Sequence, residues 1–353
     1  MASSTAAKTT TVPERPPFDS LPLDPNGPPG NAWGLYGDND RLGALNMLTP
    51  ALVASAARQE IRTGERVSLD WSLNKPSHPS FNRPPLEWKR IVKKDVNGND
   101  RTVNDDYLAF NTQGSSQWDG FRHYGYQQAK RFYGNVRIEE LEDPDVIGID
   151  AWVEKGGIVG RGVLLDYAGY CRAHGKPLAP YESTAISVAD LEAVLAYQKG
   201  PELQKGDILF VRSGCTEVYE QMPPEEQMAL CERPLPNYIG LLANKTTLRW
   251  LWDNGFSAVA GDAPSFEQGP LAGPHVYPGH TELSTEDEAL MKGGGLIHQW
   301  VLAGWGVPIG EMFDLEALAK KCTEQQRWSF FLSSVPLKVP GGVASPPNAI
   351  AIF

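Results

Sequence analysis

The stretch Asn111–Tyr126, NTQGSSQWDGFRHYGY, places two carboxamides, one carboxylate and one imidazole close together in the chain. These are Gln113, Gln117, Asp119 and His123, spaced by four, two and four positions. Glycine and serine between them allow a loop to fold back so that several side chains converge. If a helix begins here, Asp119 and His123 share a face and the carboxylate can orient the ring. The stretch predicts an acid/base pair beside a seat for a cation or a substrate carbonyl, or else a polar loop whose side chains cap turns.

Apolar segments and helix-start signals alternate along much of the remaining chain. Four segments have the composition of strands: 146–152, 162–167, 208–211 and 256–260. Three helices are marked by favoured first residues: Thr49-Pro50, Ser187 followed by Asp190, and Asn244. This alternation predicts an α/β fold whose strands are mostly buried.

The composition limits the classes of partner and compartment. The 353 residues suffice for one large domain, and 41% apolar residues is ordinary for a soluble globular protein. A formal net charge of -11 disfavours nucleic acid and anionic membrane surfaces as partners. The four cysteines show no C-x-x-C spacing, and no apolar run has membrane-spanning length. We expect a soluble, cytoplasmic protein whose partner is a small-molecule substrate.

The chain predicts one domain with two irregular additions. Residues 1–17 are small, polar and proline-containing, so we expect a disordered N-terminal arm, with a single domain over 18–353. Residues 74–106 are charged and proline-rich and predict a long insert with a hairpin turn at Asn97-Gly98. Long inserts of this kind often lie over a site and select the substrate.

The spacing of the opening stretch resembles the H-x-G-T-H-x-D-x-x-x-H signature of a cyclase family that includes bacterial kynurenine formamidases and isatin hydrolases. Asp119 and His123 match its last two positions, whereas Gln113 and Gln117 replace its two leading histidines and Ser115-Ser116 replace Gly-Thr. Later landmarks follow in order: VLLDY near Asp166, ILFVRSG at 208–214, AVAGDAPS at 258–265, His298, and AGWGVPIGEMFDLEAL at 303–318. The resemblance implies a swivelling β/β/α-type fold with a compact barrel-like central sheet. Together with the proline-rich arms it suggests a homodimer or homotetramer.

The resemblance also implies roles for individual residues. In the family the two leading histidines and the aspartate bind metal, and the last histidine is the acid/base. Asp119 is then a metal ligand or the residue that orients the attacking water, and His123 transfers the proton. His298 and Glu311 match a later histidine and glutamate that serve a second metal or the site wall, with a spacing about one residue longer than the family's. His298 could instead pack beside Trp300.

The two glutamines bear on the choice of metal. Replacing imidazole by carboxamide keeps the charge of the site but changes the donor from nitrogen to oxygen, which suits harder ions. We expect no organic cofactor, and a divalent cation, if bound, to be manganese or magnesium rather than zinc. The candidate metal ligands are Asp119, Gln113, Gln117, His298 and Glu311.

Two further residues are candidates for substrate contact, besides Gln113 and Gln117. Arg212 follows an apolar strand and could clamp a substrate oxygen, or pair with a buried acid such as Asp166. Trp118 could form an aromatic wall for a planar substrate, or pack in the core; the same alternatives hold for Phe121, Tyr124 and Tyr126.

Other polar residues near strand ends carry weaker signals. Asp262 ends an apolar strand, where α/β proteins place functional groups, and could instead cap the next turn. His275 and His280 in HVYPGH predict a lid or solvated loop more readily than a metal pair. Cys215 has no identifiable base beside it, so no nucleophilic role is predicted.

We therefore expect a hydrolase or cyclase that acts on a small cyclic or aryl amide, imide, lactam or lactone by water attack. The alternative is a metal-independent cyclase or dehydratase of secondary metabolism, in which an Asp119–His123 dyad acts on a carbon acid and the two glutamines bond the enolate oxygen. A third interpretation is a binding protein that has lost catalysis. Retention of both Asp119 and His123 argues against it.

Overall fold

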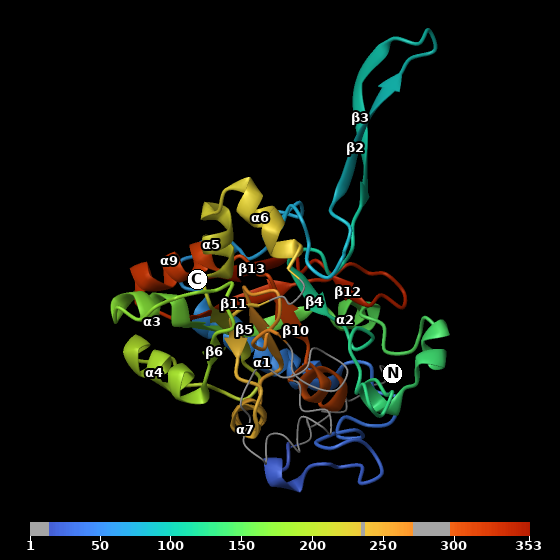
Figure 1. Ribbon diagram of the computed structural model, residues 1–353. Helices are drawn as coiled ribbons and strands as arrows, with labels where there is room; N and C mark the ends of the chain where they lie inside the picture. Colours follow the sequence, from blue (N-terminus) through green and yellow to red (C-terminus); the bar gives the residue numbers. More distant parts are fainter. Residues whose placement is uncertain (1–13, 234–236, 271–296) are drawn as a thin grey trace, which may run out of the picture.

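A nine-stranded sheet, curled into a half-barrel, forms the centre of the computed structural model, which describes residues 14–233, 237–270 and 297–353 (Figure 1). Its strands are, in spatial order, β1 (Arg66–Ser68), β13 (Ala349–Ile352), β11 (Ser329–Ser334), β5 (Ile158–Asp166), β7 (Ile208–Arg212), β9 (Ala258–Gly261), β10 (Ile309–Glu311), β4 (Gln117–Asp119) and β12 (Ala344–Ser345). Strands β5, β7, β9 and β10 run parallel, and the other neighbours are antiparallel. The predicted α/β class with a barrel-like sheet is confirmed.

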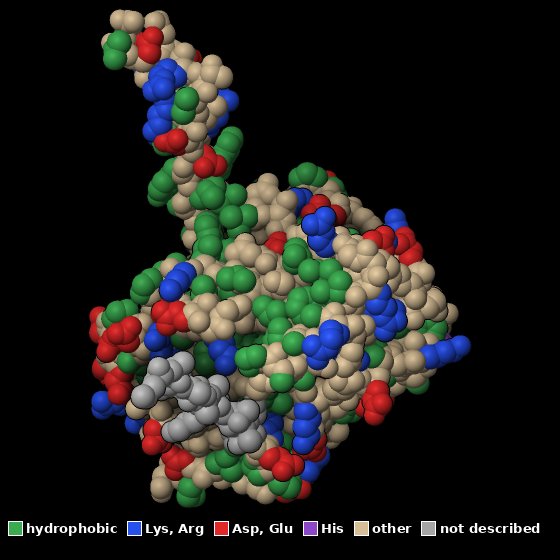
Figure 2. All heavy atoms as spheres, turned by 180° about the vertical axis from the view of Figure 1, so that it is seen from behind, with side chains coloured by type: hydrophobic (Ala, Val, Ile, Leu, Met, Phe, Trp, Pro, Cys, Tyr) green, Lys and Arg blue, Asp and Glu red, His purple; other side chains and the backbone are tan. Residues whose placement is uncertain are grey.

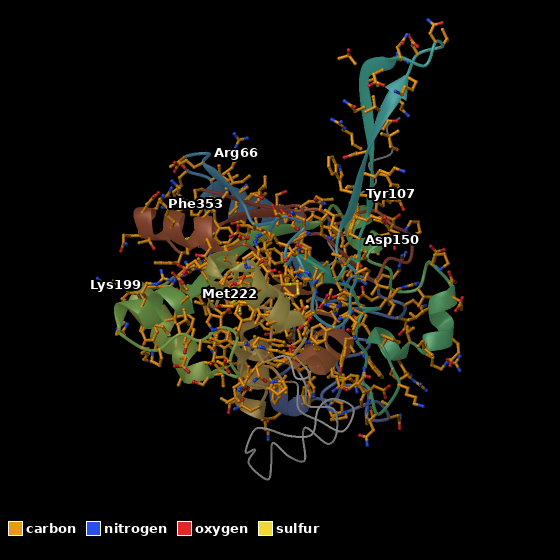
Figure 3. All side chains as sticks on the ribbon, turned by 45° about the horizontal axis from the view of Figure 1, so that its top comes forward. Arg66, Tyr107, Asp150, Lys199, Met222 and Phe353 are labelled. Carbon is orange, nitrogen blue, oxygen red and sulfur yellow. The ribbon has the colours of Figure 1, made fainter. Side chains whose placement is uncertain are left out.

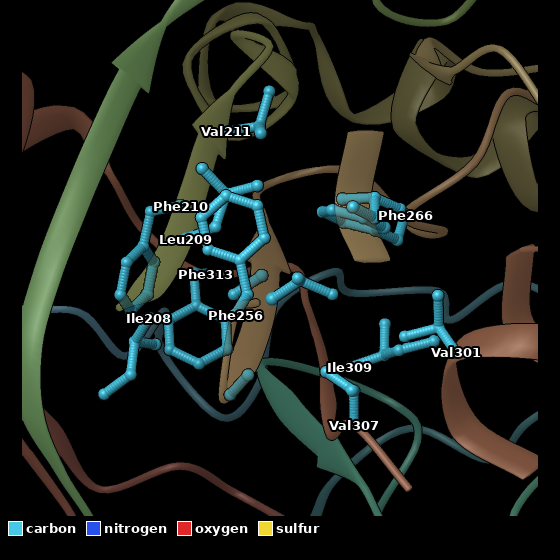
Figure 4. Packing of buried hydrophobic residues seen from close by; sticks show 14 of the residues in the cluster. Ile208, Leu209, Phe210, Val211, Phe256, Phe266, Val301, Val307, Ile309 and Phe313 are labelled. Carbon is cyan, nitrogen blue, oxygen red and sulfur yellow. The ribbon is translucent and has the colours of Figure 1, made fainter. Parts of the chain in front are cut away.

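The central parallel strands are buried along nearly their whole length. Both faces of such strands are covered, which explains why their sequences read as continuous apolar runs rather than alternating patterns. Figure 4 shows Phe210 and Phe313 packed together in this core. Their ring centroids lie 5.5 Å apart in an edge-to-face arrangement.

Helices surround the sheet and are connected by ordered loops. They are α1 (Pro50–Glu60), α2 (Asp150–Lys155), α3 (Tyr167–Ala173), α4 (Val188–Gln198), α5 (Cys215–Gln221), α6 (Pro224–Cys231), α7 (Lys245–Asn254), α9 (Glu316–Gln325) and the π-helix η5 (Gln299–Gly304). Short 3-10 helices are η1 (Phe18–Ser20), η2 (Gly43–Met47), η3 (Tyr133–Asn135) and η4 (Ile138–Glu142). Helix α1 contacts β5 and β11, and α3 contacts β7.

The predicted helix starts are confirmed by their caps. The side chain of Thr49 accepts a hydrogen bond from Leu52 N, and that of Asn244 accepts one from Thr247 N. A reciprocal capping box joins Ser187 to Asp190. Each cap satisfies a backbone donor that the first helical turn would otherwise leave unpaired.

The segment 146–152 was predicted to be a strand, and this prediction is wrong. Its residues form a turn that leads into α2, with Ile147 at a positive φ of 41°. A side chain at Gly148 would lie 2.2 Å from Asp150 Oδ1, so glycine is needed in this turn. Because Ile149 and Trp152 are buried, the run is apolar, and a short buried run does not distinguish a strand from a helix start.

The predicted insert contains the hairpin expected at Asn97-Gly98. Strands β2 (Glu87–Lys94) and β3 (Asp100–Ala109) pair into a ribbon that extends away from the body (Figure 1). At its tip Gly98 has a φ of +83° and donates from its backbone N to Asp95 O. A second small sheet pairs β6 (Ala185–Ile186) with β8 (Gly240–Leu241).

Of the predicted N-terminal arm, residues 1–13 lie outside the described part of the chain. Residues 14–17 are ordered: Arg15 donates to Phe256 O at 2.8 Å, and Pro16 O accepts from Trp252 Nε1 at 2.8 Å. Within the described ranges, no helix has the length and apolar character needed to cross a bilayer.

Candidate active site

The short strand β4 positions the residues at the centre of the site. Side chains alternate along a strand, so Gln117 and Asp119 lie on one face of β4 and Trp118 lies on the other. Antiparallel pairing with β10 sets Glu311 directly opposite Gln117. The chain then turns at Gly120, whose carbonyl accepts from His123 N, and this turn brings His123 back beside Asp119.

Four ionisable side chains meet at this point. Asp119 Oδ2 lies 3.5 Å from His298 Nε2 and 3.9 Å from His123 Nε2, and His298 Nε2 lies 3.1 Å from Glu311 Oε1. Asp119 is fully buried, whereas the His123 side chain keeps 19% of its surface exposed. The structure thus brings together Asp119, His123, His298 and Glu311, all of them predicted site residues.

The two glutamines complete this arrangement. Gln117 Nε2 donates to Gln113 Oε1 at 2.7 Å and to Glu311 Oε2 at 2.8 Å. The amide nitrogen of Gln117 thus points toward Glu311, and Gln113 Oε1 accepts a hydrogen bond from the same nitrogen. In this arrangement Gln117 stabilises Glu311 by N–H donation, whereas Gln117 Oε1 is buried and has no hydrogen-bond partner in the described structure, so it stays available for the oxygen-ligand role.

A carboxylate that the sequence analysis missed fixes His298. Glu267 is fully buried; its Oε2 lies 2.6 Å from His298 Nδ1, and its Oε1 accepts from His298 N. The sequence feature that could have identified Glu267 is its position as an acidic residue shortly after the apolar strand β9. Asp262, which stands directly at the end of that strand, carries the more obvious positional signal in the sequence.

Burial and neighbouring charges shift the pKa values of His123 and His298 in opposite directions. Burial disfavours a charged His298, but Glu267, Asp119 and Glu311 outweigh it and raise the pKa of His298 well above its usual value. Burial lowers the pKa of His123 below 6.5, although Asp119 opposes the shift. Burial and the charge of Asp119 raise the pKa of Glu311 to about 7. At neutral pH, therefore, His123 is the neutral imidazole of the cluster.

The cluster fits a divalent cation. One ligand atom from each of Asp119, His123 and His298 can be chosen so that all three lie within 4.8 Å of one another. Asp119 Oδ2 is buried and has no hydrogen-bond partner in the described structure, as expected for an oxygen reserved for a ligand. Carboxylate oxygen and imidazole nitrogen suit zinc and manganese alike.

Arg212 does not face this cluster. Its side chain is 3% exposed and donates to Asp166 Oδ1 at 2.7 Å, to Glu217 Oε2 at 2.8 Å and to Glu316 Oε1 at 2.9 Å. The alternative of a buried ion pair with Asp166 is the one that the structure shows. The prediction that Arg212 binds substrate is corrected accordingly, because its donors are committed to carboxylates.

Trp118 is a core residue and not a substrate contact. It is fully buried, and its indole nitrogen donates to Ser334 Oγ at 2.9 Å on the face of β4 opposite to Asp119. Phe121 and Tyr126 are also buried, Phe121 against Trp152. Of the aromatic set only Tyr124 borders the cluster, with its ring centroid 5.6 Å from that of His298.

The weaker candidates have structural roles where they are described. Asp262 accepts from the backbone N of Gly214 and Cys215 and so stabilises the turn into α5. Burial raises the pKa of the Cys215 thiol well above its usual value, which makes it a poor nucleophile. His275 and His280 lie outside the described residues.

Known proteins share the architecture of this chain. A protein-family model described as putative cyclase matches residues 42–268 of this chain. The crystal structure of a novel cyclase is 30% identical and superposes with a TM-score of 0.74, covering 92% of this chain and 99% of its own. Isatin hydrolase A from Ralstonia solanacearum is 18% identical with a TM-score of 0.52, covering 86% of this chain and 97% of its own. An isatin hydrolase bound to the product analogue thioisatinate is 13% identical with a TM-score of 0.53, covering 88% and 98%. The two isatin hydrolases share the fold, and no protein of curated function matches significantly.

Proposed function

Because this chain belongs to the putative cyclase family, we propose that it is a hydrolase or cyclase that adds water to a small cyclic or aryl amide, imide, lactam or lactone. The observation that carries the proposal is the convergence of the buried Asp119 and His298 with the half-buried His123 within the family's fold. The likeness to isatin hydrolases, one of which is bound to the product analogue thioisatinate, supports a cyclic amide among the substrates.

His123 is the residue proposed to move the proton. As the neutral imidazole it takes a proton from water while the water oxygen bonds to the substrate carbonyl carbon. The same ring then returns the proton to the leaving nitrogen or oxygen as the carbon–nitrogen or carbon–oxygen bond breaks. Asp119, 3.9 Å from His123 Nε2, orients the ring and the water. Glu267 holds the ring of His298 so that Nε2 faces Asp119.

A divalent cation would be held by Asp119 and by the deprotonated form of His298, whose proton it would displace, with Glu311 adjacent, and it would supply polarisation of the water and the substrate carbonyl. Gln113 and Gln117 stand where the family signature has imidazoles, so nitrogen donors favoured by zinc are fewer here. We infer that manganese or magnesium is preferred over zinc.

A second candidate is the metal-independent cyclase or dehydratase. The orientation of Gln117 favours it, because the amide nitrogen already stabilises Glu311 by hydrogen bonding, as a cation would otherwise do by charge. Asp119 and His123 would then act as a dyad on a carbon acid. Activity that persists in chelator distinguishes this candidate from the cation-dependent hydrolase.

Acid release from a substrate panel tests the proposal, because opening an imide, an aryl lactam or a lactone yields a carboxylic acid. We expect wild-type protein supplied with manganese to release acid from at least one class. His123→Ala should lower that rate by about 10²- to 10⁴-fold. The exposed His174→Ala serves as a matched control and should leave the rate unchanged. Absence of turnover in every class, or full activity in His123→Ala, would contradict the proposal.

A further inference from the structure

The hydroxyl group of Tyr238 is a buried hydrogen-bond donor that the described structure leaves without a partner. The residue is 2% exposed, and its hydroxyl oxygen has no hydrogen-bond partner among the described residues. Buried polar groups in native proteins are nearly always paired, and an unpaired one costs stability. Three atoms of the candidate site are in the same condition: Gln113 Nε2, Gln117 Oε1 and Asp119 Oδ2. An unpaired buried hydroxyl group at such a place is expected where a ligand supplies the missing partner.

Backbone pairing holds Tyr238 next to the segment that carries Glu267. Tyr238 O accepts from Gly269 N at 3.0 Å, and Leu241 N donates to Phe266 O at 3.0 Å. Between them, a β-carbon at Gly240 would lie 2.3 Å from the carbonyl carbon of Glu267, so this close approach requires glycine. Residues 238–241 therefore run beside the segment whose carboxylate holds the ring of His298.

The charges of the site act on the Tyr238 hydroxyl group. Burial raises its pKa above the usual value, and the carboxylates of Glu311 and Glu267 raise it further. The positive charges of His298 and Arg83 oppose this shift. The hydroxyl group is thus within the electrostatic reach of the cluster, and near neutral pH it keeps the proton that it needs in order to donate.

Arg83 brings a positive charge to the same region from the root of the insert. Its Nη1 donates to Gln113 O at 2.7 Å, which fixes the guanidinium group beside the site. Beyond this root the β2–β3 ribbon stands clear of the body, as Figure 2 shows, and Figure 3 labels Tyr107 on β3 where the ribbon joins the body. The insert thus reaches the site through Arg83 at its root.

A narrow cavity reaches Tyr238 from the side of α5. Its lining is mostly aromatic and apolar and includes Trp71, Tyr219 and Met312 besides Tyr238. Met312 directly follows the site residue Glu311 in the chain. Tyr238 therefore borders this cavity with its side chain while its hydroxyl group responds to the charges of the cluster. A carbonyl compound whose ring enters the cavity would present its oxygen to this hydroxyl group.

We propose that the Tyr238 hydroxyl group donates a hydrogen bond to the carbonyl oxygen of the substrate and stabilises the negative charge that develops there as water adds. The inference rests on the proposed function. Asp119, Glu267 and Glu311 are carboxylates and repel such an oxyanion, so the oxygen needs a donor of another kind. A donor that is already in place stabilises the transition state without reorganisation during the reaction. The proton stays on the tyrosine oxygen throughout.

The other unpartnered donor of the site acts on a carboxylate instead. Burial opposes the ionisation of Asp119, but His123, His298 and the Gln113 side chain together lower its pKa. Gln113 is therefore directed at Asp119, which leaves Tyr238 as the donor for the substrate oxygen.

The variant Tyr238→Phe tests the inference, because it removes the hydroxyl group and keeps the ring. With the panel substrate that the wild type converts, kcat should fall by about 10²- to 10³-fold and KM should change much less, because the bond is strongest in the transition state. The midpoint of urea unfolding should not fall, because the free protein loses no hydrogen bond and one unpaired buried group is removed.

Tyr126→Phe is the matched control, since the buried Tyr126 hydroxyl group donates to Pro29 O at 3.0 Å. It should show the opposite pattern, a lower urea midpoint with the kcat of the wild type.

Two results for Tyr238→Phe would overturn the inference alone while the wild type is active: an unchanged kcat, or a urea midpoint that falls as far as in Tyr126→Phe. The second result would show that the hydroxyl group is bonded in the free protein and has a structural role. A wild type that converts no substrate of the panel would contradict the proposed function, and the role of Tyr238 with it.

Discussion

Nδ1 of His298 lies 2.6 Å from Oε2 of Glu267, and both side chains are buried. A carboxylate on one ring nitrogen fixes both the orientation of an imidazole and the direction in which its other nitrogen points. That other nitrogen, Nε2, faces Asp119 and Glu311. Glu267 is thus a positioning residue, which acts on the site through His298.

Replacing Glu267 by glutamine should lower kcat/KM by about 10- to 100-fold, because the ring of His298 loses its charged partner while the volume is kept. Steady-state kinetics measures the loss, and calorimetry should show weaker binding of manganese in the same variant. The exposed acid Glu232, changed to glutamine, is the control. A Glu267→Gln variant with wild-type kinetics and wild-type metal binding would remove the positioning role.

The pH profile of kcat/KM should report His123. Burial holds the pKa of this ring below 6.5. Below that pKa the ring is protonated and cannot accept a proton from water; above it the ring is a neutral base. Activity should therefore rise with pH on the acid side with a midpoint below pH 6.5, in a profile recorded from about pH 4.5 to 8. An acid limb centred above pH 6.5 would argue against His123 as the base.

Metal titration should distinguish the two proposed chemistries. We expect protein freed of metal to bind manganese or magnesium in preference to zinc, and Asp119→Asn to lose this binding because the site loses a charged oxygen ligand. Restoring imidazoles by Gln113→His with Gln117→His should shift the preference toward zinc. Elemental analysis and calorimetry measure both effects. Tight stoichiometric zinc in the wild type would contradict the expected selectivity.

Arg212 should matter for stability and not for substrate binding. Arg212→Met leaves Asp166 and its neighbours without a cation in a buried setting, so the free energy of unfolding should fall by about 3–5 kcal/mol. The exposed Arg172, which pairs with Glu217, provides the control: Arg172→Met should cost less than about 1 kcal/mol. Urea unfolding measures both changes. A raised KM in Arg212→Met without loss of stability would restore the substrate-binding role.

The parts of the fold that local chemistry dictates could be predicted from the sequence. The caps at Thr49 and Asn244 and the hairpin turn at Gly98 each depend on a few adjacent residues. The buried strands could be predicted because apolar runs bounded by polar turns are typical of parallel sheets. The segment 146–152 could not be assigned, since its apolar character comes from the packing of a turn and a helix start.

The candidate site could be predicted as a set of residues but not as a geometry. Resemblance to a family signature identified Asp119, His123, His298 and Glu311, which the fold does bring together. The orientation of Gln117 depends on the pairing of β4 with β10, which spacing does not reveal. Strand β4 has only three residues, which is too short for an alternation of side chains to be recognised in the sequence, so the sequence does not show that Trp118 points away from Asp119.

The most direct test of the account is to run turnover in water labelled with heavy oxygen, using whichever panel substrate releases acid, and to weigh the product by mass spectrometry. Water attack assisted by His123 predicts one labelled oxygen in the new carboxylate, formed by wild type and lost with His123→Ala. An unlabelled product, or labelled product formed equally fast by His123→Ala, would contradict the account.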